Sequence, residues 1–273
     1  MSRPPAWFIY PTLLLVLLLA ALGRRTHADS PPPPPALPSP ERAVLAETTP
    51  IDPAALVRVR SAHGPDAGTA FSVGDGGVWL TSQTSLADCA HPAVLVNDLE
   101  GVAARAVAGP GGRVAVLVSV RGAPALSLAT AAPSPGALAF APGFPHGRPG
   151  EVAAHLIGTR TLRVAGRDGP RASALVWAEM GRTEGLNGSL SGLAGAPLLD
   201  SEGRVVGLVL AEAPRRGRLY VAPPAELAAA LAAARTLRPV QASGATITAD
   251  DYGLAADALR RTLRVAPTAC ITR

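Results

Sequence analysis

Short apolar stretches separated by polar and glycine-rich breaks recur through the middle of the chain. Residues 55–60 alternate apolar and polar side chains, which predicts a half-exposed strand. Further apolar stretches follow at intervals of about eight to twelve residues, with Gly, Pro or Asp between them. We therefore expect strands at residues 68–73, 78–82, 93–97, 103–108, 113–120, 137–141, 151–158, 162–165, 174–178, 204–210 and 218–222. This spacing is typical of an antiparallel barrel or sandwich.

Two later segments have the pattern of helices. Residues 224–236 are rich in Ala and begin with a proline, which is favoured at the first position of a helix. Residues 250–265 carry two aspartates at the start and three arginines towards the end. That order of charges complements a helix dipole, so we expect a second helix there.

The N-terminal segment differs in character from the rest of the chain. Residues 7–22 form an apolar run of about sixteen residues, which is short for a membrane span but within reach of one. Aromatic residues at its start and arginines after its end are typical of interfacial anchors. We expect residues 1–25 to be an N-terminal transmembrane helix, and a cleavable signal peptide is the alternative. Residues 26–50, which include five consecutive prolines, then form a Pro-rich linker.

Composition narrows the function classes. The chain of 273 residues has 16% charged residues and no lysine, a bias typical of a GC-rich bacterium. Its net charge of +5 permits weak binding to anionic surfaces. The arginines are scattered, however, and aromatic residues make up only 4%, which argues against nucleic-acid binding. The sequence contains no Cys/His cluster of the zinc-binding kind, so we expect neither a metal nor a cofactor.

A loop of small residues at 191–197 leads into a short apolar run, a turn and a predicted buried strand. Its sequence, Gly192-Leu193-Ala194-Gly195-Ala196-Pro197-Leu198, resembles the G-x-S-G-G-P-L motif of trypsin-like serine proteases. We call residues 191–197 the nucleophile loop. Ala194 stands at the position of the nucleophilic serine, and a methyl group cannot attack a carbonyl. The motif therefore implies the fold and argues against its chemistry.

Two earlier segments resemble the same family, in particular its HtrA-type members. Residues 68–73 and 78–81 resemble the run G-T-G-F-x-V … L-T-N-x-H-V-V, which places Thr84 at the position of the catalytic histidine. A threonine hydroxyl is not a general base near neutral pH. Residues 113–117 resemble D-L-A-V-L, which places Arg113 at the orienting carboxylate with the wrong sign of charge.

The resemblance covers about residues 55–230 and implies an all-β fold. We expect a trypsin-like double antiparallel β-barrel over residues 51–240, with one or two C-terminal helices. Residues 241–273 would form a C-terminal helix and tail packed on this domain. If the domain is exported, Cys89 and Cys270 are expected to form a disulfide that ties the tail to the body, with two unrelated buried thiols as the alternative.

With all three triad positions replaced, we expect a pseudoprotease that binds a peptide or protein partner of the bacterial envelope. Gly192, Leu193, Ala194 and Gly195 would form a vestigial oxyanion loop whose backbone N–H groups face the cleft. Ala196 replaces the second glycine of the motif and would restrict the loop if that position needs a positive φ. The expected location is the bacterial inner membrane, single-pass, with the domain in the periplasm; secretion after signal cleavage is the alternative.

Two other functions stay open. One is an active serine endopeptidase with displaced residues, in which Ser191 or Ser189 is the nucleophile and His91 or His63 is the base. The other is a purely structural envelope protein without a peptide groove. Each of the five histidines is otherwise expected to be an ordinary surface or structural residue.

Overall fold

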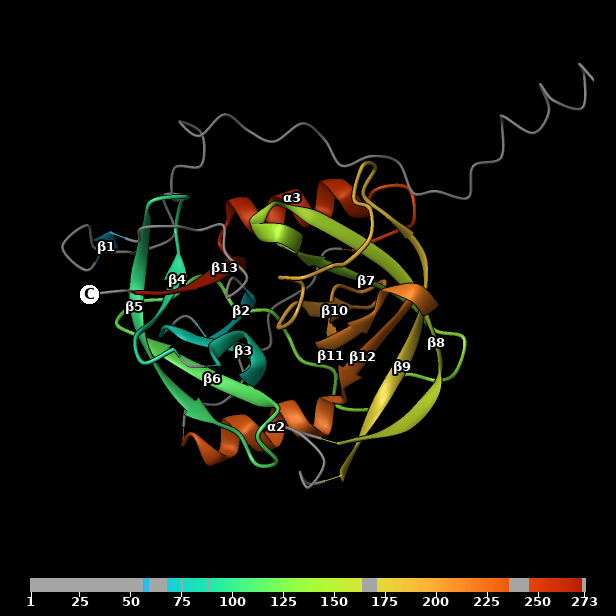
Figure 1. Cartoon of the computed structure of the whole chain (residues 1–273), viewed down its shortest axis with the longest axis horizontal. Coiled ribbons are helices and arrows are strands. Elements are labelled where there is room, and N and C mark those ends of the chain that lie inside the picture. The colour runs from blue at the N-terminus through green and yellow to red at the C-terminus, as the bar shows by residue number, and fades with distance from the viewer. Residues whose placement is uncertain are drawn as a thin grey trace, which may run out of the picture.

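The computed structural model describes residues 56–58, 68–74, 76–87, 89–163, 171–235 and 246–271. Two β-barrels lie side by side and two helices pack against them, which confirms the predicted double antiparallel barrel (Figure 1). The expected membrane anchor and Pro-rich linker lie outside the described residues. Within the described ranges, no helix is long and apolar enough to cross a membrane.

The first barrel combines strands from both ends of the described chain. Its strands pair in the order β5-β4-β13-β2-β3-β6, the β5–β6 pairing closes the barrel, and β1 is added outside β5. The strands are β1 (Leu56–Arg58), β2 (Gly68–Gly74), β3 (Val78–Ser82), β4 (Pro92–Leu95), β5 (Glu100–Ala108), β6 (Val114–Ser119) and β13 (Val265–Cys270). The C-terminal strand β13 thus completes a barrel whose other strands come from the N-terminal half.

The second barrel comes from one continuous stretch of chain. It closes in the order β10-β11-β12-β9-β8-β7. The strands are β7 (Leu138–Gly143), β8 (Gly150–Arg163), β9 (Arg171–Arg182), β10 (Pro197–Leu199), β11 (Val205–Ala213) and β12 (Arg218–Ala222). The two strands predicted at 151–158 and 162–165 are wrong as separate elements, because β8 continues through a register shift between Leu156 and Gly158.

The predicted helices form, but both end earlier than expected. Helix α2 spans Pro224–Ala233, and helix α3 spans Tyr252–Arg261. The prediction that the latter helix reaches residue 265 is wrong because Leu263 has φ 55°, which ends the helix and turns the chain into β13. Short 3-10 helices complete the fold: η5 (Gln83–Leu86), η6 (Pro145–Gly147) and η7 (Pro214–Arg216).

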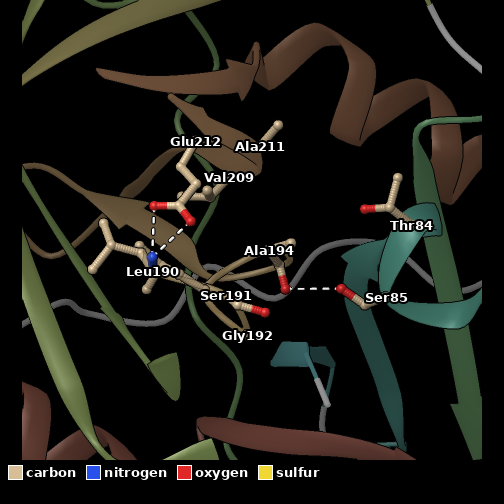
Figure 2. Close-up of a pocket in the computed structure, with 10 residues that line it drawn as sticks. Thr84, Ser85, Leu190, Ser191, Gly192, Ala194, Val209, Ala211 and Glu212 are labelled. Atoms are coloured by element: carbon tan, nitrogen blue, oxygen red, sulfur yellow. Dashed lines mark hydrogen bonds between the residues drawn. The ribbon is translucent and has the colours of Figure 1, made fainter. Parts of the chain in front are cut away.

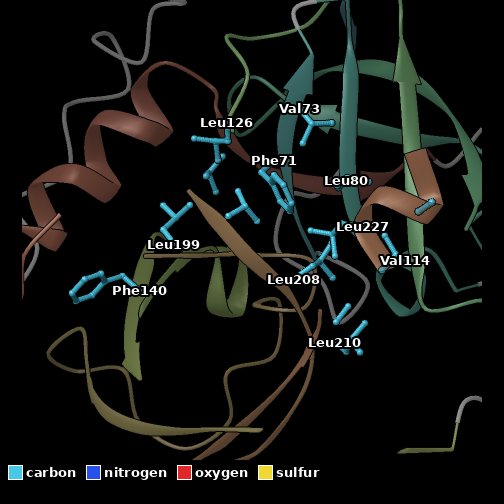
Figure 3. Close-up of a cluster of buried hydrophobic side chains, with 14 of the residues drawn as sticks. Phe71, Val73, Leu80, Val114, Leu126, Phe140, Leu199, Leu208, Leu210 and Leu227 are labelled. Atoms are coloured by element: carbon cyan, nitrogen blue, oxygen red, sulfur yellow. The ribbon is translucent and has the colours of Figure 1, made fainter. Parts of the chain in front are cut away.

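A shared apolar core fixes the two barrels against each other. Figure 3 shows Phe71 and Leu80 of the first barrel beside Leu208 of the second, with Leu227 of α2 against them. All four side chains are fully or almost fully buried. Burial of one such side chain stabilises the fold by about 1.5–3 kcal/mol. The walls of any cleft between the barrels are therefore held in a defined position.

The C-terminal segment contacts both barrels. Tyr252 of α3 stacks on Phe140 of the second barrel, with ring centroids 5.0 Å apart. Arg260 of α3 forms a buried ion pair with Glu151 of β8. The end of β13 is fastened to the first barrel by the predicted disulfide between Cys89 and Cys270, whose Cα atoms lie 5.5 Å apart, and this confirms the expected pairing.

Candidate functional site

A pocket of about 200 Å³ lies between the two barrels at the nucleophile loop (Figure 2). The first barrel contributes two hydroxyl side chains from η5, and the second contributes the loop and the end of β11. The lining residues are Thr84, Ser85, Leu190, Ser191, Gly192, Leu193, Ala194, Val209, Ala211 and Glu212. Two of the three substituted triad positions, Thr84 and Ala194, therefore meet at this pocket.

Thr84 is exposed, and its hydroxyl has a neutral hydrogen-bond partner. Its hydroxyl lies 2.8 Å from the Ser82 hydroxyl, and Ser82 also caps η5 by accepting from the Thr84 N–H at 3.3 Å. The neighbouring Ser85 hydroxyl donates to the carbonyl of Ala194 at 3.0 Å, so it spans the cleft between the barrels (Figure 2). These contacts provide structure and no group that can accept a proton from a nucleophile near neutral pH.

Arg113 does not join the other two positions. Its side chain is 6% exposed, and its guanidinium forms an ion pair with Glu226 at the start of α2. It also donates to the carbonyl of Ser173 at 2.8 Å. A buried guanidinium needs a carboxylate partner, and α2 provides one. Arg113 is therefore a structural residue that links the first barrel to α2 and to β9 of the second barrel.

The backbone of the nucleophile loop is held by contacts that do not involve the triad side chains. Gly192 and Gly195 have φ of 95° and 91°, a region that favours glycine. Thr69 of β2 donates its N–H to Ala194 O at 3.0 Å and its hydroxyl to Gly192 O at 2.8 Å. The N–H of Gly195 donates to Val209 O at 2.7 Å. Hydrogen bonds from the first barrel thus hold the nucleophile loop, which belongs to the second barrel.

The loop leaves two backbone donors for a ligand. The Ser191 carbonyl accepts from the His146 N–H at 2.5 Å, so the Gly192 N–H of the same peptide points the opposite way. Neither the Gly192 N–H nor the Ala194 N–H donates to any acceptor among the described residues. Ala196 is not among the residues with positive φ, so the condition under which it would restrict the loop is not met.

The displaced-residue alternative can be compared with the positions of the histidines. None of the histidines in the described ranges lines the pocket, and His63 lies outside those ranges. His91 is exposed and follows the disulfide-bonded Cys89. Ser191 lines the pocket, whereas the Ser189 hydroxyl donates to the carboxylate of Glu212. The His146 ring contacts a serine only through the backbone carbonyl of Ser189, at 2.7 Å from Nε2, and no serine hydroxyl in the described ranges is hydrogen-bonded to a histidine side chain.

Glu212 is the charged residue of the pocket lining, and the sequence did not single it out. It lies near the end of β11, and both carboxylate oxygens are 2.6 Å from the Leu190 N–H (Figure 2). Its backbone pairs with Leu219 of β12 on one side. The other neighbour, β10, pairs with β11 only as far as Leu208. The signal that could have found it is an acid directly after the apolar run of residues 205–211.

The remaining described residues hold no group of three or more metal-ligating side chains. The site therefore consists of hydroxyls, backbone donors and one carboxylate. Such a set can hold a polar or peptide ligand, but it offers no activated nucleophile in the arrangement described.

Comparisons with known proteins agree with this architecture. The family model described as trypsin-like peptidase domain matches residues 68–208. Among solved structures, a serine-to-alanine mutant of Rv3671c from M. tuberculosis H37Rv in its inactive form is 24% identical, with a TM-score of 0.52 over 68% of this chain and 89% of that one. The Rv3671c protease in its inactive form is 23% identical, with a TM-score of 0.51 over 65% and 87%. No curated protein matches the chain significantly.

Proposed function

Since the chain belongs to the family of trypsin-like peptidase domains, we propose that it is a member that binds a peptide or protein segment without cleaving it. The observation that carries this proposal is the pairing of Thr84 and Ala194 across one pocket while Arg113 faces α2. Acyl transfer in this family needs a nucleophile, a base and an orienting carboxylate at these positions. None of the three substituted side chains can take over its role.

Three features support binding. The free N–H groups of Gly192 and Ala194 can donate to a carbonyl or carboxylate oxygen of a ligand. The end of β11 has one unpaired edge in the described structure, which suits an extended peptide that adds as a strand. The shared core packs the two barrels against each other beside the pocket. A ligand held in this way gains backbone hydrogen bonds and meets no reactive group.

We propose further that the domain is held at the bacterial inner membrane and faces the periplasm. The apolar run at residues 7–22 and the Pro-rich segment that follows it motivate an anchor and a spacer. The disulfide suits an oxidising compartment. The partner would be a peptide segment of another envelope protein. Protease digestion at residue 46 or within the domain would test this placement. A periplasmic domain should be digested in spheroplasts and protected in inside-out membrane vesicles.

The loss of catalysis is tested with a fluorophosphonate probe, which labels only activated serines. The full chain in neutral detergent should show no labelling above a heat-denatured control, while active trypsin in the same detergent is labelled. Ala194→Ser should stay unlabelled because it restores the hydroxyl without a base. Adding Thr84→His to Ala194→Ser should give weak labelling. Labelling of the unaltered chain, lost in Ser191→Ala or Ser189→Ala, would instead establish a displaced-residue peptidase.

Binding is tested with fluorescein-labelled random hexapeptides titrated with the full chain and followed by anisotropy. We expect Ala211→Trp to abolish the anisotropy rise, because the indole fills the pocket that Ala211 lines. Ala131→Trp places the same side chain at an exposed position outside the pocket, so it should bind like the unaltered chain. If neither the unaltered chain nor the control binds the pool, the proposal fails and a purely structural role is favoured.

A further inference from the structure

Strand β8 is paired with two neighbours over only part of its length. On one side β7 pairs with β8 as far as His155, and the Leu156 N–H then donates to the Ala137 carbonyl at 2.9 Å. Beyond this point, residues 158–163 are paired with β9 alone in the described part of the chain. We call residues 158–163 the β8 edge; strand β8 lies on the side of the second barrel away from the first (Figure 1). An open strand edge is a template on which another strand can pair.

The direction of the backbone groups at the β8 edge follows from a contact of the opposite strand. The Arg113 guanidinium donates to the Ser173 carbonyl at 2.8 Å, so this carbonyl of β9 points away from β8. Ser173 is opposite Thr161, and opposite residues of an antiparallel pair exchange either both backbone hydrogen bonds or neither. The N–H and C=O of Thr161 therefore face the open side, and the alternation along the strand places those of Thr159 there too. The Thr159 carbonyl accepts from the Arg160 side chain at 3.2 Å, which agrees with this direction.

The charge around the β8 edge has one sign. The edge and the facing residues 171–174 of β9 contain three arginines, Arg160, Arg163 and Arg171, and no acidic residue. Arg163 and Arg171 are directly opposite in the register, and like charges at opposite positions destabilise a sheet. Arg160 is exposed and belongs to no ion pair among the described residues. Acidic side chains on an added strand would compensate this excess of positive charge.

We propose that the β8 edge is a second interaction surface, which binds an extended acidic segment of a partner protein as an added strand. The inference is separate from the proposed function, because the β8 edge shares no residue with the pocket beside Ala194. Backbone groups of Thr159 and Thr161 would hold the segment, and the arginines would select its charge. A second copy of this chain is a poor occupant, because pairing two β8 edges would bring their arginines together.

The test compares two pools of amidated octapeptides that carry fluorescein at the N-terminus. Each position is Val, Thr or Glu in one pool and Val, Thr or Gln in the other, so the pools differ in charge and not in side-chain size. The full chain in neutral detergent carries Ala211→Trp, which fills the pocket. Anisotropy titrations in about 50 mM NaCl should give an apparent Kd about fivefold lower for the Glu pool, as expected for a few opposite-charge cross-strand pairs. In about 500 mM NaCl the difference should shrink, because salt screens exposed charges.

Variants in the same background then assign the binding to the β8 edge. Thr161→Pro removes an outward N–H, a position at which an edge strand tolerates proline, and should weaken binding of the Glu pool about tenfold or more. Thr161→Val keeps the backbone N–H and should bind like its parent. Arg160→Gln should reduce the preference for the Glu pool, whereas Arg216→Gln removes an exposed charge outside the β8 edge and should keep it.

Hydrogen exchange on the chain without these substitutions gives a measurement that does not depend on the fold of a variant. Saturation with the Glu pool should slow exchange of the Thr159 and Thr161 amides. Equal affinity for the two pools, full binding by a folded Thr161→Pro variant, or unchanged exchange at both amides would each overturn the proposal and leave the proposed function of the pocket untouched. A concentration-dependent dimer that Thr161→Pro abolishes in sedimentation would assign the β8 edge to a second copy and overturn the acidic partner.

Discussion

The two barrels are closed by strands from different parts of the chain. All six strands of the second barrel come from one stretch, residues 138–222, and the nucleophile loop lies within that stretch. The first barrel is incomplete until β13 arrives from the C-terminus and the disulfide fastens it to Cys89. The second barrel therefore presents the loop from a locally specified scaffold, whereas the first depends on contacts between distant parts of the chain.

The same contrast runs across the cleft. On the second-barrel side, glycine conformations and backbone hydrogen bonds hold the loop, and none of them needs a catalytic side chain. On the first-barrel side, Thr84 lines the pocket, whereas Arg113 does not line it and is paired with Glu226 of α2. The frame of a catalytic site and its chemistry are thus separable. A fold of this family can keep the frame of the site after the catalytic side chains are replaced, because the frame and the chemistry depend on different interactions.

The largest expected effect on stability comes from disrupting the close contact of β2 and β3 with the nucleophile loop. A Cβ added at Gly195 would lie 2.0 Å from Thr69 O and 2.5 Å from the Thr81 hydroxyl, at a φ of 91°. Since these are groups of β2 and β3 that cannot move without breaking the sheet, we expect Gly195→Ala to lower the free energy of unfolding by about 5 kcal/mol or more. Urea unfolding followed by tryptophan fluorescence measures it.

Gly188→Ala is the matched control for this substitution. Gly188 also has a positive φ, 73°, but an added Cβ would meet nothing within 4 Å. Its cost is therefore the backbone strain alone, about 1 kcal/mol. Similar losses of unfolding free energy in the two variants would show that the cost at Gly195 comes from its positive φ and not from the contact between the barrels.

The next effect addresses the closure of the first barrel. The disulfide links residues separated by 181 positions, so it removes much conformational freedom from the unfolded chain. We expect Cys89→Ser with Cys270→Ser to lower stability by about 4 kcal/mol. Hydrogen exchange should accelerate most in β13 and β2, because these strands pair with each other, and least in β9 of the second barrel. Uniform acceleration in both barrels would contradict the separate closure of the first.

A smaller effect is expected at the pair that Arg113 makes with α2. Arg113→Met leaves the Glu226 carboxylate, 13% exposed, without its partner, and should lower stability by about 2–3 kcal/mol. Adding Glu226→Leu should restore most of this loss, because both charges are then absent. Urea titrations of the two single variants and the double variant measure the coupling.

The same variants test whether Arg113 belongs to the cleft. Because its side chain does not line the pocket, the double variant should bind the hexapeptide pool as the unaltered chain does. Weaker binding by a fully folded double variant would show that Arg113 contributes to the peptide site. It would contradict a purely structural role for this residue.

The sequence was most informative where structure is local. The strand spacing predicted an antiparallel barrel or sandwich, because turns and apolar periodicity act over a few residues. The double barrel was implied by the family resemblance of the loop motif. The partner of Arg113 was not predictable, since Glu226 lies 113 positions away and meets it only after α2 packs. β13 was missed because it follows a helical pattern directly and becomes a strand only by pairing with β2 and β4. Glu212 was missed for the same reason, as its role depends on where β10 ends.

The smallest effect concerns the helix that joins the barrels. The Tyr252 side chain is 2% exposed, and its hydroxyl has no hydrogen-bond partner in the described residues. Burial, and then the charge of Glu151, raise the pKa of this phenol well above its ordinary value. In the unfolded chain a tyrosine ionises at about pH 10. Above that pH the unfolded state therefore binds fewer protons than the folded state, and stability falls as the pH rises.

Tyr252→Phe removes this dependence together with an unpaired buried hydroxyl. At pH 8 the stability should change by less than about 1 kcal/mol, because the stacking on Phe140 is retained. Between pH 9.5 and about pH 11, where the unfolded phenol ionises, the urea midpoint of the variant should fall less than that of the unaltered chain. Parallel declines would mean that Tyr252 ionises as readily in the folded protein as in the unfolded one. The helix α3 would then open without unfolding the second barrel, and the C-terminal segment would bind the first barrel more firmly than the second.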